Sequence, residues 1–325
     1  MKVFSVAALL LVLAASGVAR TQQTSPQAPP RPAGKAPEEQ QTIRVTSTLV
    51  NTLFTVIDRN GKGKFITGLK RDNFRIFEDD KPQAITNFSS ESNLPLSIAL
   101  LIDTSSSTRI RLKAEQEAAI DFFYAVMQRN KDRGMVISYD SGVDVRQDFT
   151  DNPEKLADAL RKVKPGGGTS LADAVSLAIS EKLAKEAEDR RRVLIIIGDG
   201  EDNSSERTID DAVDMAQKHN VTIYTISTNS SAYFGTNAQA RNDKNLKQFA
   251  DDTGGFPFFP PKMEEMALNF VDIGTELRSQ YTIAYRPTKP DDATFRKIRI
   301  EVAGFKDYKV RHRAGYYAPT PPTQK

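Results

Sequence analysis

Residues 97–107 read SIALLIDTSSS, a nearly continuous apolar run that ends in an aspartate and a series of hydroxyl side chains. A second apolar run, residues 193–197, reads VLIII and is followed, after one glycine, by Asp199. Runs of this kind are typical of central strands in a parallel sheet that is covered on both faces. A helical pattern follows each run, and ligands of such βα sheets bind outside the carboxyl ends of the strands. We therefore expect Asp103 and Asp199 at that edge.

Hydroxyl side chains accompany the two aspartates at the predicted edge. The five candidate metal ligands are Asp103, Ser105, Ser107, Thr169 and Asp199. Two carboxylates and three hydroxyls, without His or Cys, suit Mg²⁺, Mn²⁺ or Ca²⁺ rather than zinc. Mg²⁺ keeps some of its positions for water, so one position remains for an oxygen of a partner. The sequence thus predicts a divalent-cation site, with Mg²⁺ as the first choice.

The same polar residues have a structural alternative. Residues 103–107 could cap a helix or form a turn, because Asp and Ser satisfy free backbone N–H groups there. Ser170 and Asp173 also have capping-box spacing ahead of a helix predicted over residues 171–188. Ser170 can cap this helix while Thr169 binds metal, so the two interpretations are compatible.

The five candidate ligands, in this chain order, resemble the metal-ion-dependent adhesion site of von Willebrand factor type A domains. The elements predicted for residues 94–278 also follow the order of that fold. The resemblance implies a Rossmann-like, mostly parallel sheet with helices on both faces. It further implies that Ser105, Ser107 and Thr169 coordinate Mg²⁺ through hydroxyls, while the two aspartates hold it directly or through water. The carboxylate of an Asp or Glu from a protein partner would complete the coordination.

Two segments with period-two alternation flank this predicted domain, at residues 42–93 and 279–317. Each segment is below the size at which a disulfide-free domain usually folds alone, but together they approach the roughly 100 residues of a β-sandwich. We expect one sandwich, built from N- and C-terminal strands, with the α/β domain inserted. The alternative is two small sheets that extend the core or pack on it. Residues 72–83, 281–287 and 313–317 also resemble the VWFA-related family of acidobacterial genomes, which implies no named partner.

The two ends of the chain differ from the rest in composition. Residues 1–19 combine Lys2, an apolar run and a small-residue end, a pattern that predicts a secretory signal peptide and a periplasmic or extracellular protein. Residues 20–41 are rich in Pro and Gln, which predicts a flexible linker, and residues 318–325 are expected to form a tail. The chain has no cysteine, which excludes disulfides and thiolate metal sites. We expect no membrane span after signal cleavage.

Composition and motifs also bear on the class of function. The formal net charge of +3 favours neither a nucleic acid nor an acidic partner surface. His219 and His312 allow no plausible Ser-His-Asp arrangement. We therefore expect an exported, non-enzymatic protein-binding module for adhesion or assembly. The alternatives are a metal-dependent hydrolase, with Glu201 or Asp202 as general base, and an envelope protein that the ion only stabilises.

One predicted loop is unusually long. Residues 228–244 span 17 residues after an expected strand, whereas connections of this kind usually have 2–6. The loop leaves the carboxyl end of the strand and carries Tyr233 and Phe234 among small polar residues. These two aromatic side chains are expected either to contact a partner as anchors or to fold back as a local plug.

Overall fold

The computed structural model describes residues 49–59, 64–90, 94–229, 237–262 and 265–321 of the 325-residue chain. The predicted signal peptide and linker, residues 1–41, lie outside the described residues, as do Tyr233 and Phe234. Among the described residues, no helix combines the length and the apolar character that a membrane crossing requires.

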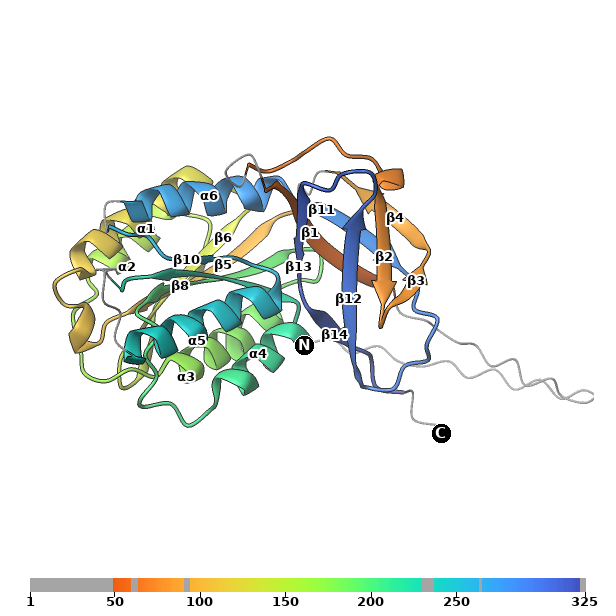
Figure 1. Cartoon of the computed structure of the whole chain (residues 1–325). Coiled ribbons are helices and arrows are strands. Elements are labelled where there is room, and N and C mark those ends of the chain that lie inside the picture. Colours follow the sequence, from red (N-terminus) through yellow and green to blue (C-terminus); the bar gives the residue numbers. More distant parts are fainter. Residues whose placement is uncertain (1–48, 60–63, 91–93, 230–236, 263–264, 322–325) are drawn as a thin grey trace, which may run out of the picture. The chain divides into compact units, whose positions relative to one another are not determined.

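A six-stranded sheet forms the centre of the α/β part (Figure 1). Its strands are β5 (Leu96–Asp103), β6 (Arg133–Tyr139), β7 (Val143–Thr150), β8 (Arg191–Gly198), β9 (Val221–Ser227) and β10 (Pro257–Phe258). They lie in the order β10-β9-β8-β5-β6-β7, and β7 is antiparallel to β6 while the other pairs are parallel. Every residue of β5 is buried, as its apolar sequence predicts.

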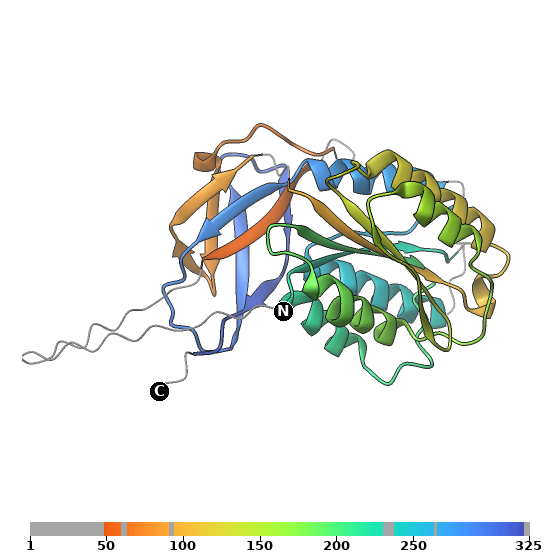
Figure 2. The same ribbon diagram turned by 180° about the vertical axis from the view of Figure 1, so that it is seen from behind.

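Helices cover both faces of this sheet (Figures 1 and 2). One face packs on α1 (Leu112–Val126), α2 (Pro153–Arg161) and α6 (Met266–Arg278). The other face packs on α3 (Leu171–Leu177), α4 (Ile209–Lys218) and α5 (Asn237–Thr253). The mostly parallel α/β fold expected from the sequence is therefore confirmed.

One predicted helix and one predicted loop differ from the structure. The helix expected over residues 171–188 changes geometry after Leu177, where a π-helical turn (Ala178–Lys182) and a 3₁₀ turn (Leu183–Lys185) follow. This change of winding keeps Ile179 and Leu183 fully buried. The prediction of a 17-residue loop over residues 228–244 is wrong, because α5 already begins at Asn237. Its first turns carry only small and polar side chains, so they lack the apolar periodicity by which a helix is recognised.

The terminal segments form two four-stranded antiparallel sheets. Their strands are β1 (Val50–Asp58), β2 (Phe74–Glu78), β3 (Lys81–Gln83), β4 (Ile85–Ser89), β11 (Tyr281–Tyr285), β12 (Phe295–Val302), β13 (Tyr308–His312) and β14 (Gly315–Tyr317). One sheet has the order β13-β1-β11-β4 and the other β14-β12-β2-β3, so each combines strands from both ends of the chain. One apolar cluster takes residues from both sheets, and the two sheets pack as a sandwich (Figure 1).

A charged pair lies inside this sandwich. Glu78 and Arg296 approach within 3.4 Å, and both side chains are only 1% exposed. The hydroxyls of Tyr285 and Tyr316 each donate to Glu78 Oε2 at 2.8 Å. Arg296 also contacts Asp292 at 3.1 Å. Both members of the pair therefore have further polar partners, as burial of charge requires.

The sandwich and the α/β part are joined directly. β4 precedes β5 in the chain, α6 is followed by β11, and β4 and β11 pair with Ser89 opposite Thr282. Buried Glu276 on α6 accepts a hydrogen bond of 2.9 Å from Thr55 Oγ1 on β1. The same carboxylate pairs with Arg311 on β13 at 3.2 Å. Strands from both ends of the chain thus hold the last helix of the α/β part.

Candidate metal centre

The carboxyl ends of β5 and β8 bring the predicted acidic residues together. The two strands are neighbours with Ile102 opposite Ile197, which places Asp103 beside Gly198 and ahead of Asp199. Asp103 is fully buried and Asp199 is 6% exposed. Parallel strands end at a common edge, and this is the edge expected from the sequence.

Hydrogen bonds connect four of the five candidate ligands. The Ser105 N–H donates to Asp103 Oδ1 at 2.7 Å, and the hydroxyls of Ser105 and Ser107 lie 3.0 Å apart. The Ser107 hydroxyl donates to Asp199 Oδ2 at 2.8 Å. Ser105 is buried whereas Ser107 is exposed, so the cluster reaches the surface at Ser107.

Thr169 joins this cluster through its loop. Gly166 N–H donates to Thr104 O at 2.6 Å, and Ser106 N–H donates to Gly167 O at 3.0 Å. These two bonds fasten the glycine-rich loop to the loop that follows β5. The Thr169 backbone N–H donates to Asn203 Oδ1 at 2.9 Å, in the loop that follows Asp199. The three predicted segments are therefore in mutual contact.

Gly198 leaves space for the Asp103 carboxylate. A Cβ atom placed on Gly198 would lie 2.6 Å from the Tyr139 hydroxyl and 3.0 Å from Asp103 Oδ2. These distances are too short for any side chain, so the position favours glycine for steric reasons. The glycine between the apolar run of β8 and Asp199 thus has a direct role in the site.

Several buried oxygen atoms of this edge have no hydrogen-bond partner in the described part of the chain. They are Asp103 Oδ2, both carboxylate oxygens of Glu115, the Tyr139 hydroxyl and Thr228 Oγ1. Burial raises the pKa of Asp103 to about 7, and the negative charge of Asp199 acts in the same direction. An unpaired, buried carboxylate oxygen among hydroxyls is costly unless a cation compensates it, so these residues fit a divalent ion.

Hydroxyl ligands are needed for such an ion. In the described ranges, no group of three or more His, Cys, Asp or Glu side chains converges closely enough to bind a metal. The two aspartates alone supply too few ligands for the six oxygens that Mg²⁺ takes. Ser105, Ser107 and Thr169 are the neighbouring side chains that could complete the set.

The capping box predicted for Ser170 and Asp173 is wrong. The Ser170 side chain makes no capping bond, because its backbone (φ −113°, ψ 62°) is not in the extended conformation of a usual N-cap. Asp173 instead accepts from the backbone N–H groups of Glu206 and Arg207 at 2.9 and 3.1 Å. Asp202 accepts from Ala172 N–H at 3.3 Å and so binds the start of α3. Sequence reasoning missed this role because Asp202 is 30 residues away.

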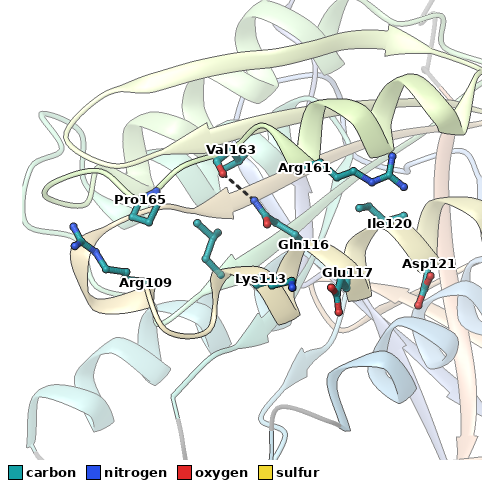
Figure 3. A pocket seen from close by; sticks show the side chains of 10 residues that line it. Arg109, Lys113, Gln116, Glu117, Ile120, Asp121, Arg161, Val163 and Pro165 are labelled. Carbon is teal, nitrogen blue, oxygen red and sulfur yellow. Dashed lines mark hydrogen bonds between the residues drawn. The ribbon is translucent and has the colours of Figure 1, made fainter.

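A pocket of about 800 Å³ lies between α1 and α2, beside the candidate metal centre (Figure 3). Its end at Arg109 and Pro165 is continuous with the loops that carry Ser107 and Gly166. The Gln116 side chain crosses between the helices and donates to Leu160 O and Val163 O at 2.8 and 2.9 Å.

Arg109 lies at the end of this pocket next to Pro165, and Lys113 follows it along α1 (Figure 3). Both are exposed, as are Arg161 at the opposite end of the pocket and Lys162 and Lys164 in the segment after it. Arg161 pairs with Asp158 at 3.0 Å, whereas the other four have no ion pair within the described ranges. Glu117 and Asp121 line the opposite end. Exposed cations therefore gather beside the acidic edge of the sheet, along the start of α1 and after α2.

The metal-free protein is expected to lose stability as pH rises from about 4 to about 8. Burial raises the pKa of Asp103 from 3.8 to about 7 and that of Glu115 from 4.5 to about 8. Across this window the folded chain retains protons that the unfolded chain has released, so its free energy of unfolding falls with rising pH. Thermal unfolding in a chelator at several pH values measures this dependence. Saturating Mg²⁺ should flatten it, and a metal-free Tm that rises from about pH 5 to about pH 8 would contradict the assignment.

Comparison with known proteins gives one family and several similar folds. Residues 97–272 match the family model described as von Willebrand factor type A domain. An uncharacterized protein of Borreliella burgdorferi strain B31 is 28% identical over 141 residues, which cover 42% of this chain and 40% of that protein. The match thus spans less than half of this curated relative.

The chain is also similar to two solved structures. Proximal thread matrix protein 1 of the mussel byssus, with a zinc-occupied MIDAS motif, has a TM-score of 0.50 and 16% identity, covering 62% of this chain and 50% of that one. A von Willebrand factor type A protein of Catenulispora acidiphila has a TM-score of 0.49 and 11% identity, covering 86% and 76%. Identities this low concern the fold alone.

Proposed function

Because the chain belongs to the von Willebrand factor type A domain family, we propose that it is a protein-binding module that captures a partner's carboxylate through a divalent ion. The hydrogen-bonded cluster of Asp103, Ser105, Ser107 and Asp199, with its unpartnered buried oxygen on Asp103, carries the proposal. Thr169 completes the ligand set. Mg²⁺ is the favoured ion, with Mn²⁺ and Ca²⁺ as alternatives. The bound ion would supply a Lewis-acidic position for an anionic oxygen.

Accessibility supports a role in binding. Ser107 is exposed at the edge of β5 and β8, so an oxygen from outside can approach the cluster there. Asp103, Ser105 and Thr169 are buried beneath it and are held by backbone hydrogen bonds. A preformed set of oxygen ligands with one open side suits an ion that exchanges water for a partner's carboxylate.

Local charge supports an acidic partner segment. Arg109 and Lys113 line the pocket between α1 and α2 (Figure 3), and the exposed Lys162 and Lys164 lie between α2 and the glycine-rich loop. Such a group raises the local concentration and the association rate of negatively charged ligands. We propose that the partner carries acidic residues next to the captured carboxylate and that they contact these cations. We also propose that the mature protein is exported.

Fluorescence anisotropy with synthetic peptides tests the proposed function. The probe is a labelled peptide with one aspartate flanked by glutamates, and the matched peptide carries asparagine in place of the aspartate. We expect the purified chain to bind the aspartate peptide in the presence of Mg²⁺ and to release it when a chelator is added. The asparagine peptide should bind weakly with Mg²⁺ and with chelator. Equal binding of both peptides in chelator would overturn the proposal. Metal-dependent hydrolysis would instead support an enzyme, and metal-dependent melting without peptide binding would support a structural ion.

Reversal of two charges beside the pocket should weaken this binding without affecting the ion. Arg109→Glu combined with Lys113→Glu is expected to raise the Kd of the acidic peptide by roughly tenfold at low ionic strength, because both cations face the bound segment. Calorimetry should find an unchanged Mg²⁺ affinity. The matched control is Lys306→Glu with Lys309→Glu, two exposed positions of the sandwich. Peptide affinity that is insensitive to the first pair would place the partner elsewhere.

A further inference from the structure

Glu115 on α1 is a buried carboxylate without a partner. Its side chain is fully buried, and neither carboxylate oxygen has a hydrogen bond or ion pair with any described residue. Other buried glutamates differ from it. Glu276 is bound by Thr55 and Arg311, and Glu78 by two tyrosine hydroxyls. An unpaired buried carboxylate destabilises a fold, so its presence calls for a partner that is not a protein group.

The position of Glu115 connects it with the metal centre. Ser107, Arg111 and Glu115 are spaced four residues apart, and the Glu115 N–H donates to Arg111 O at 3.1 Å. Arg111 in turn donates from Nη2 to Ser107 O at 3.4 Å and from Nη1 to Thr228 O. Glu115 therefore lies one helical turn behind the loops that carry the proposed ligands.

Charge effects support this proximity. Burial raises the pKa of Glu115 to about 8, Arg111 lowers it, and the negative charges of Asp103 and Asp199 raise it further. The charges of both aspartates thus act on Glu115. The three carboxylates do not converge closely enough to share one ion directly. Water bound to an ion can span the remaining distance and supply the missing hydrogen-bond donors.

We propose that Glu115 accepts hydrogen bonds from water bound to the ion and thereby strengthens the binding of Mg²⁺. This inference rests on the proposed metal-binding function. Glu115 acts as a positioning residue, because it orders the ion's water and is not itself a ligand. Its charge has a second effect: once all three carboxylates are ionised, they and the Arg111 guanidinium leave two net negative charges in the cluster, which one divalent ion balances.

Calorimetric titration of the full chain with MgCl₂ tests the role of Glu115. Glu115→Gln keeps the volume but removes the charge and one acceptor, and it is expected to raise the Kd for Mg²⁺ by on the order of 10- to 100-fold. The Tm in chelator should not fall, since no protein contact of the carboxylate is lost. Glu117→Gln is the matched control, because Glu117 is exposed on the same helix. Its Mg²⁺ affinity should equal that of the wild type.

The possible outcomes separate this inference from the proposed function. If the wild type binds Mg²⁺ and Glu115→Gln binds it equally well, only the role of Glu115 is overturned. If the wild type binds no divalent ion, the metal site is overturned as well. Glu115→Met is the second variant, in case the amide disturbs the fold. The inference is supported if either variant binds Mg²⁺ weakly and keeps the Tm of the metal-free wild type. A purely structural glutamate would instead give a lower Tm and an unchanged Kd for Mg²⁺.

Discussion

Asp103→Ala is expected to abolish the binding of divalent ions and to leave the fold intact. The substitution removes the hydrogen bond from the Ser105 N–H and a buried oxygen that has no partner among the described residues. No apolar packing is lost, so the metal-free protein should keep its Tm within a few degrees. The Mg²⁺ affinity should fall by roughly 100-fold or more, because the loss of a ligand exceeds the effect of a residue that acts through water. Calorimetry and circular dichroism measure the two quantities.

The experiment also includes a second variant of the site and a control variant. Asp199→Ala should behave in the same way, because Asp199 holds the Ser107 hydroxyl at the same site. Glu206→Ala is the control, because Glu206 is exposed and the substitution keeps its backbone N–H, which donates to Asp173. An Asp103→Ala protein that binds Mg²⁺ or Mn²⁺ as tightly as the wild type would contradict the metal site and, with it, the proposed capture of a carboxylate.

Arg296→Met is expected to destabilise the sandwich by about 3–5 kcal/mol. The substitution leaves Glu78 buried, with two tyrosine donors but without the cation that balances its charge. Urea unfolding, followed by circular dichroism, measures the loss as a lower midpoint. The double variant Arg296→Met with Glu78→Gln should recover part of it, because the amide oxygen still accepts from the tyrosines and carries no charge. A loss below about 1 kcal/mol would show that the pair is dispensable.

The sequence predicted the central strands well because their signal is local. The runs that became β5 and β8 consist almost entirely of apolar residues, and both strands are buried along their length. The start of α5 was missed because its first turns are polar in sequence, and the π turn after Leu177 was missed because it leaves the apolar pattern unchanged. The sequence thus did not reveal the element boundary and the change of winding that leave no mark in the apolar pattern.

The candidate site, too, was predicted from the sequence only where its signal lies within short segments. The carboxylates and hydroxyls were found because three short segments carry them in a recognisable order. The role of Asp202 depends on a contact with Ala172, and no pattern within either segment indicates it. Glu115 did leave a signal, since it lies at helical spacing between Leu112 and Ala119 on the apolar face of α1. A single acidic residue in an otherwise apolar stripe is the sign by which it could have been noticed.

The pairing of β4 with β11 has a consequence for how the chain folds. Ser89 lies opposite Thr282, so this pair of strands closes a loop that contains the whole α/β part. In an unfolded chain such a closure carries an entropy cost that grows with the logarithm of loop length. A folded α/β part already holds its two ends together and removes most of that cost. The order of events is thereby biased: local βα units form first, and the distant strands of the sandwich join once their ends have been brought near each other.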